Sequence, residues 1–69
     1  MTASATIQDV TGKKGQSSRI EVKVSASQID FPYTDDASRK AQLACARKYL
    51  NVAKEAGAKL KVKELEPKA

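Results

Sequence analysis

The sequence has no histidine, no tryptophan and a single cysteine, Cys45. One thiol cannot form an internal disulfide bond, which excludes the class of small secreted domains that disulfide bonds hold together. The usual ligands of a zinc site are missing as well, because such sites need several histidine or cysteine side chains. We therefore expect a protein that binds no metal and no cofactor and that depends on side-chain packing for its stability.

Long apolar stretches are also absent. The longest apolar run is far shorter than the ~20 residues that cross a bilayer, and residues 1–4 lack the basic and apolar segments of a signal peptide. These absences predict a cytoplasmic protein with no membrane partner. Because no histidine is available as a general base or to activate Cys45, the sequence also predicts that the protein is not an enzyme.

What the sequence does have is positive charge. Lysine and arginine contribute 13 residues against 8 aspartates and glutamates in a chain of 69, which gives a formal charge of +5. A basic surface favours a polyanionic partner, because lysine side chains displace counterions from phosphates. The same charge also serves to keep a small protein soluble.

The chain is short enough for a single domain. We place this domain at residues 5–65, between flexible ends at residues 1–4 and 66–69. Its core has to be thin, because a domain of about 60 residues buries only about 60 per cent of the surface that its unfolded chain exposes. We therefore expect a homodimer, in which a second copy covers an edge strand or the uncovered face of the sheet.

Three segments are predicted to be strands because apolar and polar residues alternate along them. They are residues 5–10, 19–25 and 59–64. A helix is predicted over residues 36–56, since Thr34, Asp35 and Asp36 supply a capping side chain and favourable charge at its start and Gly57 supplies a left-handed terminator. We expect residues 27–35 to be irregular, because Pro32 has no N–H to donate to a sheet.

The predicted helix carries an apolar stripe that we expect to pack on the sheet. Its members are Ala41, Cys45, Tyr49, Val52, Ala53 and Ala56, with Ala46 and Leu50 beside them. In this position the Cys45 thiol is expected to be buried and inert. Phe31 and Tyr33 are expected to close one end of the small core rather than to stack on a nucleic-acid base.

The predicted fold class is α+β, with two layers and the order β-β-α-β. A small three-stranded sheet carries one amphipathic helix on one face. A right-handed crossover through the helix predicts that the strand at 59–64 runs parallel to the strand at 19–25. Whether it lies beside that strand or beside the strand at 5–10 stays open at this point.

Basic residues form two groups on opposite sides of this predicted domain. Lys40, Arg47 and Lys54 recur every seven residues and form a ridge on the helix, which points away from the sheet. The second group lies on the strands and in the loop between the first two strands, and we take it as the candidate contact surface. It consists of Lys13, Lys14, Arg19, Lys23, Lys59, Lys61 and Lys63.

The sequence supports two hypotheses of function. The first is a small basic nucleic-acid-binding accessory protein that contacts the phosphate backbone through the strand and loop lysines. The second is a small protein–protein interaction module, an inhibitor or adaptor of the phage or plasmid type, that docks on an acidic partner or at a strand edge. The scarcity of arginine and aromatic residues favours the second, whereas the depletion of lysine at protein interface cores favours the first.

Overall fold

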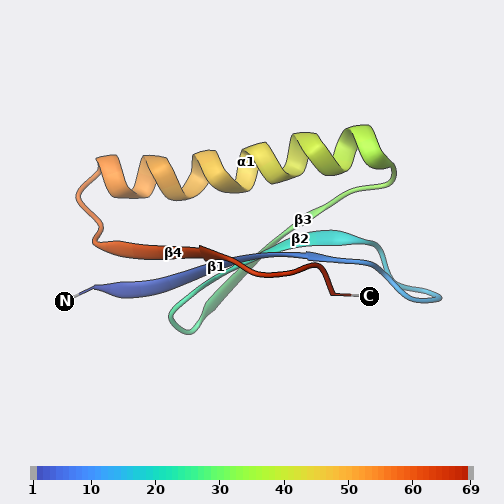
Figure 1. The fold of residues 1–69 in the computed structure, drawn as a ribbon, viewed down its shortest axis with the longest axis horizontal. Helices are drawn as coiled ribbons and strands as arrows, with labels where there is room; N and C mark the ends of the chain where they lie inside the picture. The colour runs from blue at the N-terminus through green and yellow to red at the C-terminus, as the bar shows by residue number, and fades with distance from the viewer. Residues whose placement is uncertain (1, 69) are drawn as a thin grey trace.

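The structure is a computed structural model that describes residues 2–68. Within these residues it has four strands and one helix in two layers, with the helix on one face of the sheet (Figure 1). The elements are β1 (Ala3–Val10), β2 (Arg19–Val24), β3 (Ser27–Pro32), α1 (Asp36–Glu55) and β4 (Leu60–Glu64). The predicted α+β class is confirmed. Met1 and Ala69, which belong to the ends predicted to be flexible, lie outside the described residues.

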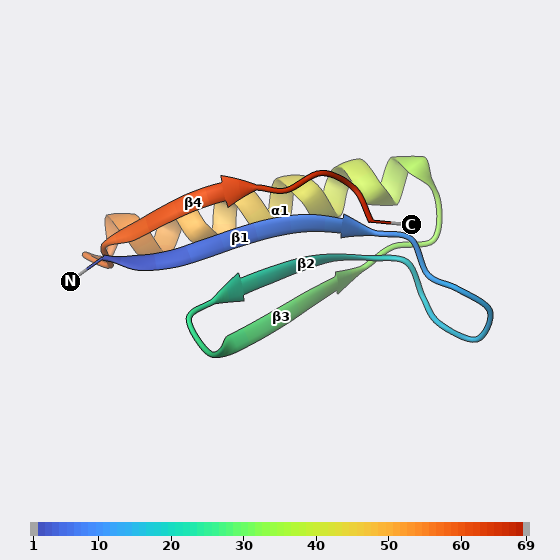
Figure 2. The ribbon, with the colours of Figure 1, turned by 60° about the horizontal axis from the view of Figure 1, so that its bottom comes forward.

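The sheet has the strand order β3-β2-β1-β4 (Figure 2). β2 pairs antiparallel with both β1 and β3, and β4 pairs parallel with β1. The prediction of three strands was therefore wrong, because the segment expected to be irregular contains β3. β1 also begins two residues before the predicted start, and Lys68 near the other end forms a bridge with Val10.

β3 forms because its residues alternate and a tight turn returns the chain onto β2. Ser25 and Ala26 make this two-residue turn, and Ser25 takes the positive φ of 53° that a hairpin turn of matching twist requires. Pro32 is tolerated because β3 is an edge strand. The Tyr33 N–H donates to the Ser18 carbonyl at 3.0 Å, so the backbone groups of Tyr33 face β2. Backbone groups of successive residues point to opposite sides of a strand, so the nitrogen of Pro32 lies on the outer edge of the sheet, where no hydrogen-bond donor is needed.

The additional strand also changes the direction of β4. The chain reverses once more before the helix, so β4 runs parallel to β1 and antiparallel to the direction of β2. The prediction that the last strand runs parallel to the strand at 19–25 was wrong for this reason. The open alternative is settled as well, because β4 lies beside β1.

Local signals set both ends of α1 as predicted. Asp35 is the N-cap, and its carboxylate accepts from the Ser38 N–H at 2.7 Å while the Ser38 hydroxyl accepts from the Asp35 N–H at 2.9 Å. The hydrogen bond from the Ser38 N–H to the carboxylate is the main reason that the pKa of Asp35 lies below its ordinary value. At the other end, Gly57 has a φ of 105°, which an L-residue rarely adopts. No helix within residues 2–68 is long and apolar enough to cross a membrane.

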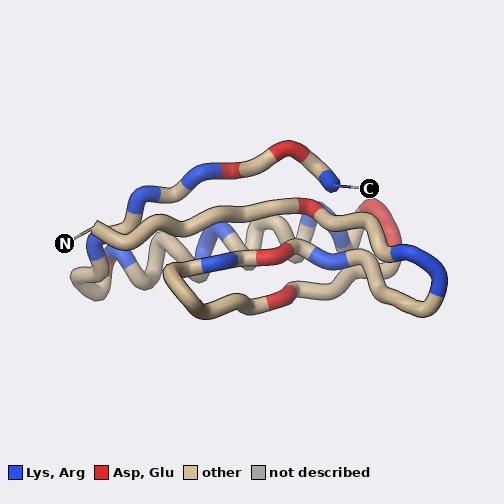
Figure 3. The backbone as a smooth tube through the Cα atoms, turned by 90° about the horizontal axis from the view of Figure 1, so that it is seen from below, with Lys and Arg blue, Asp and Glu red and all other residues tan. Residues whose placement is uncertain are grey.

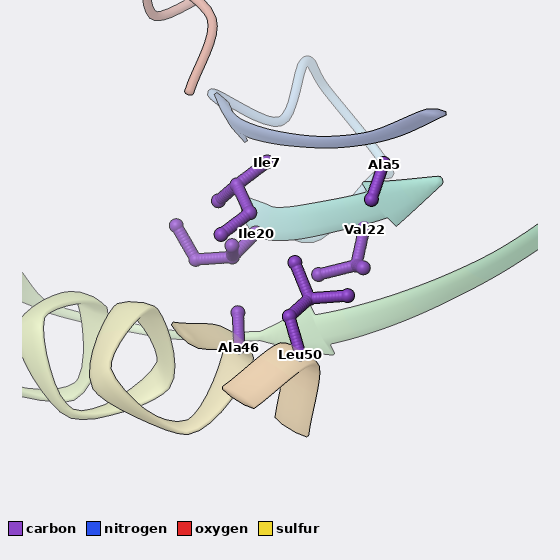
Figure 4. Close-up of a cluster of buried hydrophobic side chains, with 6 residues drawn as sticks. All are labelled: Ala5, Ile7, Ile20, Val22, Ala46 and Leu50. Atoms are coloured by element: carbon purple, nitrogen blue, oxygen red, sulfur yellow. The ribbon is translucent and has the colours of Figure 1, made fainter. Parts of the chain in front are cut away.

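The core is a small cluster between α1 and the centre of the sheet (Figure 4). Leu50 and Ala46 of the helix point toward side chains of β1 and β2. Phe31 and Tyr33 pack against the edge of the cluster, as predicted. The buried members are Ala5, Ile7, Ile20, Val22, Ala46 and Leu50.

The helix is turned differently from the prediction. Leu50 and Ala46 face the sheet, with Leu43 half-buried beside them, so the predicted stripe is rotated toward solvent by roughly a quarter of a turn. Cys45 is exposed, which corrects the expectation of a buried thiol, and Tyr49 and Val52 are 44% and 53% exposed. The physical reason is that burying leucine gains more than burying alanine, and Ala46 allows the helix to approach the sheet closely.

The orientation of the helix predicts that enlarging one alanine destabilises the protein and that enlarging another, two residues away, does not. Ala46→Leu should lower the free energy of unfolding by about 1–3 kcal/mol, because Ala46 is fully buried and the core has no room for a larger side chain. Ala44→Leu should change it by less than about 0.5 kcal/mol, because Ala44 is exposed. Urea unfolding followed by circular dichroism measures both variants. A larger loss for Ala44→Leu would contradict the observed orientation.

Candidate nucleic-acid interface

The face of the sheet that α1 leaves uncovered is polar. We call it the open face, and its members follow from the register, since residues opposite one another share a face. Apart from Val10 and Pro32, every side chain on it is polar or charged, so this face is not the apolar surface that a second copy was expected to cover. Its members are Ser4, Thr6, Gln8, Val10, Arg19, Glu21, Lys23, Gln28, Asp30, Pro32, Lys61 and Lys63.

Three lysines of the open face lie close together, and we call them the strand lysines: Lys23, Lys61 and Lys63. Thr6 of β1 is opposite Lys63 of β4 on one side and Lys23 of β2 on the other. Lys61 and Lys63 are two positions apart, which spaces them by about 6.6 Å along β4. All three side chains are exposed. Figure 3 views the sheet from the open side and marks the lysine and arginine positions along the backbone in blue.

Lys59 precedes β4 at one end of the sheet, where its carbonyl accepts from the Ala3 N–H at 2.9 Å. It is therefore close in sequence to the two strand lysines of β4. Lys13 and Lys14 lie in the loop between β1 and β2, at the opposite end of the molecule (Figure 3). The seven predicted residues are thus distributed over two ends of the sheet.

The β1–β2 loop is tightly built. The Gly12 N–H donates to the Ser18 hydroxyl at 2.9 Å, and the Gln16 N–H donates to the Lys13 carbonyl at 2.8 Å. A side chain at Gly12 would collide with the backbone of residues 16–18. The lysines of this loop are therefore held by a defined turn at the end of the sheet.

A hollow of about 310 Å³ lies between this loop and the sheet. Three cationic side chains line it: Lys13, Arg19 and Lys68. Lys68 was missed by the sequence reasoning, which assigned it to a flexible end. Its place is set by backbone pairing, because the Lys68 N–H donates to the Asp9 carbonyl at 2.8 Å and the Lys68 carbonyl accepts from the Thr11 N–H at 2.8 Å.

Acidic residues of the open face lie between these two basic groups. Glu21 pairs with Arg19 at 2.9 Å, so the charge of Arg19 is already balanced. Asp30 accepts from the Gln28 amide at 2.8 Å. Of the predicted arginine and lysine set, Arg19 is thus the member least available to an external anion.

On the helix, acidic partners balance much of the basic ridge. Arg47 donates two hydrogen bonds to Glu64, at 2.7 and 3.2 Å, and Lys40 lies 3.3 Å from Asp36. By contrast, none of the strand lysines forms an ion pair with a carboxylate of residues 2–68. Two of the three basic residues of the helix ridge are therefore paired with carboxylates, whereas the strand lysines on the open face are not.

A separate polar cluster joins the start of α1 to the end of β1. Asp9 accepts a hydrogen bond from the Tyr33 hydroxyl, and its other carboxylate oxygen lies 3.4 Å from Arg39, which also pairs with Asp36. Burial raises the pKa of Tyr33 above its ordinary value, and the hydrogen bond and negative charge of Asp9 raise it further. Because every member already has a partner, we assign this cluster a structural role.

Comparison of the chain with protein-family models, curated proteins and solved structures gives no match.

The Tyr33–Asp9 contact predicts how stability depends on pH. The folded protein holds the Tyr33 proton more tightly than the unfolded chain does, so this stabilisation is complete below about pH 10 and is lost as the pH rises through the raised pKa. Tyr33→Phe should therefore show a weaker fall in the free energy of unfolding between neutral and strongly alkaline pH. Denaturant titrations across this range measure the effect.

Tyr49→Phe is the matched control, because the Tyr49 hydroxyl has no carboxylate partner among residues 2–68. It should keep the pH dependence of the original protein. Equal behaviour of the two variants would contradict the assigned role of the Tyr33–Asp9 contact.

Proposed function

We propose that the protein binds nucleic acid through the open face of its sheet, with the strand lysines in contact with phosphates. The observation that carries this proposal is the set of exposed lysines on one face that have no acidic partner within residues 2–68. Lys13 and Lys68 extend the set at the β1–β2 loop. The proposed surface thus differs from the sequence-derived one by including Lys68 and by giving Arg19 less weight.

The chemistry of the surface favours binding without sequence specificity. Lysine ammonium groups act as point charges on phosphates, and each neutralised phosphate releases counterions. The bidentate contacts that distinguish bases come mainly from arginine, and Arg19 is paired with Glu21. The spacing of Lys61 and Lys63, about 6.6 Å, suits successive phosphates of one strand. Thr6 and Gln28 add neutral hydrogen-bonding groups beside them.

Removing two strand lysines tests the proposal. The variant Lys61→Ala/Lys63→Ala should bind a labelled duplex of random sequence more weakly. The slope of log K against log salt concentration should become shallower by about two units, one for each lost phosphate contact. Fluorescence anisotropy titrations at several sodium chloride concentrations, with duplex and single-stranded probes, give both quantities.

Lys48→Ala/Lys54→Ala is the matched control. It removes the same charge from exposed helical lysines that have no ion pair within residues 2–68. This variant should keep most of the affinity and the salt slope. If the two double variants lose affinity equally, the binding depends on net charge alone. If the original protein shows no salt-dependent binding, the proposed function is wrong.

A further inference from the structure

Exposed apolar side chains gather on one side of the molecule, beside β3. Four large hydrophobic residues among residues 2–68 are exposed, and two of them lie at this edge: Ile29 on β3 and Tyr49 on the adjacent side of α1. The third, Val52, follows Tyr49 by three positions and is turned away from the buried residues Ala46 and Leu50. The ring of Tyr49 meets Phe31 of β3 edge to face, with 6.4 Å between the ring centres. The fourth residue, Leu65, follows β4 at the other edge of the sheet. The β3 edge therefore combines an exposed isoleucine with an exposed aromatic ring.

The two edge strands differ in how they are protected. β4 alternates lysines along its length, and edge lysines oppose pairing with another strand. β3 has no lysine or arginine, and Asp30 is its only charged residue. The hydrogen bond from Tyr33 to Ser18 fixes the phase of the β2–β3 ladder, so the N–H and C=O groups of Gln28 and Asp30 point outward from the sheet. This edge is ready to accept another strand.

The surface area of the chain is large for its mass. A folded monomer of 7.4 kDa is expected to expose about 4,200 Å², whereas this chain exposes 5009 Å². The excess is close to the area of about 800 Å² that each partner contributes to a stable interface. The exposed apolar side chains at the β3 edge indicate where such an interface would form.

We propose that this interface is formed by a second copy of the chain, with the two β3 strands paired antiparallel about a two-fold axis at Ile29. In this register Gln28 of each copy lies opposite Asp30 of the other, so their amide and carboxylate groups are complementary. Moving the two-fold axis by one residue also keeps the outward N–H and C=O groups paired. It then places Asp30 opposite Asp30, where like charges repel, or Gln28 opposite Gln28. The edge is thus self-complementary in one register, which favours a second copy over an unrelated strand.

The position of the helix fits the same arrangement. α1 packs more closely against β3 than against β4, and Tyr49 on this side of the helix meets Phe31 of the edge strand. Tyr49 of each copy would then lie beside the paired strands, on the same face of the sheet as the two Ile29 side chains. The open faces of the two copies would become one continuous polar face.

The mass of the protein in solution tests the proposal without any nucleic acid, so its failure is distinct from failure of the proposed function. Sedimentation equilibrium should give about twice the monomer mass of 7.4 kDa at micromolar concentration. Ile29→Lys should be monomeric, because it places two positive charges at the axis. Leu65→Lys is the matched control, since both residues are 37% exposed, and it should remain a dimer.

A disulfide variant tests the register and does not depend on how well Ile29→Lys folds. Residues on a two-fold axis in a non-hydrogen-bonded antiparallel pair have Cα atoms about 4.5 Å apart, within the range of a disulfide. Ile29→Cys in a Cys45→Ser background should therefore form a covalent dimer under mild oxidation, and Leu65→Cys in the same background should not.

Two results would overturn the proposal. The first is an original chain that stays at the monomer mass up to its solubility limit, which would leave the β3 edge free for the strand of a different protein. The second is a dimer that Ile29→Lys, shown to be folded by circular dichroism, does not dissociate.

Discussion

One helix can cover only one face of a four-stranded sheet, and the rest of the structure depends on this constraint. The buried cluster lies entirely between α1 and the sheet, and no second layer covers the opposite side within residues 2–68. That side must therefore be polar, and the alternation along β1, β2 and β4 makes it so. The same alternation that buries Ile7, Ile20 and Val22 thus places hydroxyl, amide and lysine side chains together on the open face.

The placement of the acidic residues then decides which cations remain available. Glu64 and Asp36 hold Arg47 and Lys40 on the helix, and Glu21 holds Arg19 on the sheet. Exposed ion pairs of this kind contribute little to stability, but they balance the charge of their partners. The strand lysines have no such partner within residues 2–68, and their free charge is the basis of the proposed contact with phosphates.

A small sheet also has edges, and the two edges of this sheet differ in chemistry. Lysines along β4 protect one edge, whereas β3 ends at Pro32 and leaves two residues with outward hydrogen-bonding groups. The helix lies closer to β3 than to β4 and presents Tyr49 on that side, where its ring meets Phe31. The polar open face and the β3 edge share Gln28 and Asp30, but the strand lysines take no part in the proposed pairing.

The sequence by itself determined the features that depend on neighbouring residues. It predicted the helix and its cap, the Gly57 terminator, the alternation in β2 and β4, and most of the lysines of the candidate surface. Only the tertiary structure decided β3, because the effect of Pro32 depends on whether its nitrogen faces a neighbouring strand or an edge. It also decided the rotation of α1, the exposure of Cys45 and the position of Lys68. Each of these depends on which strand lies beside which, and a local pattern cannot specify contacts between residues that are distant along the chain.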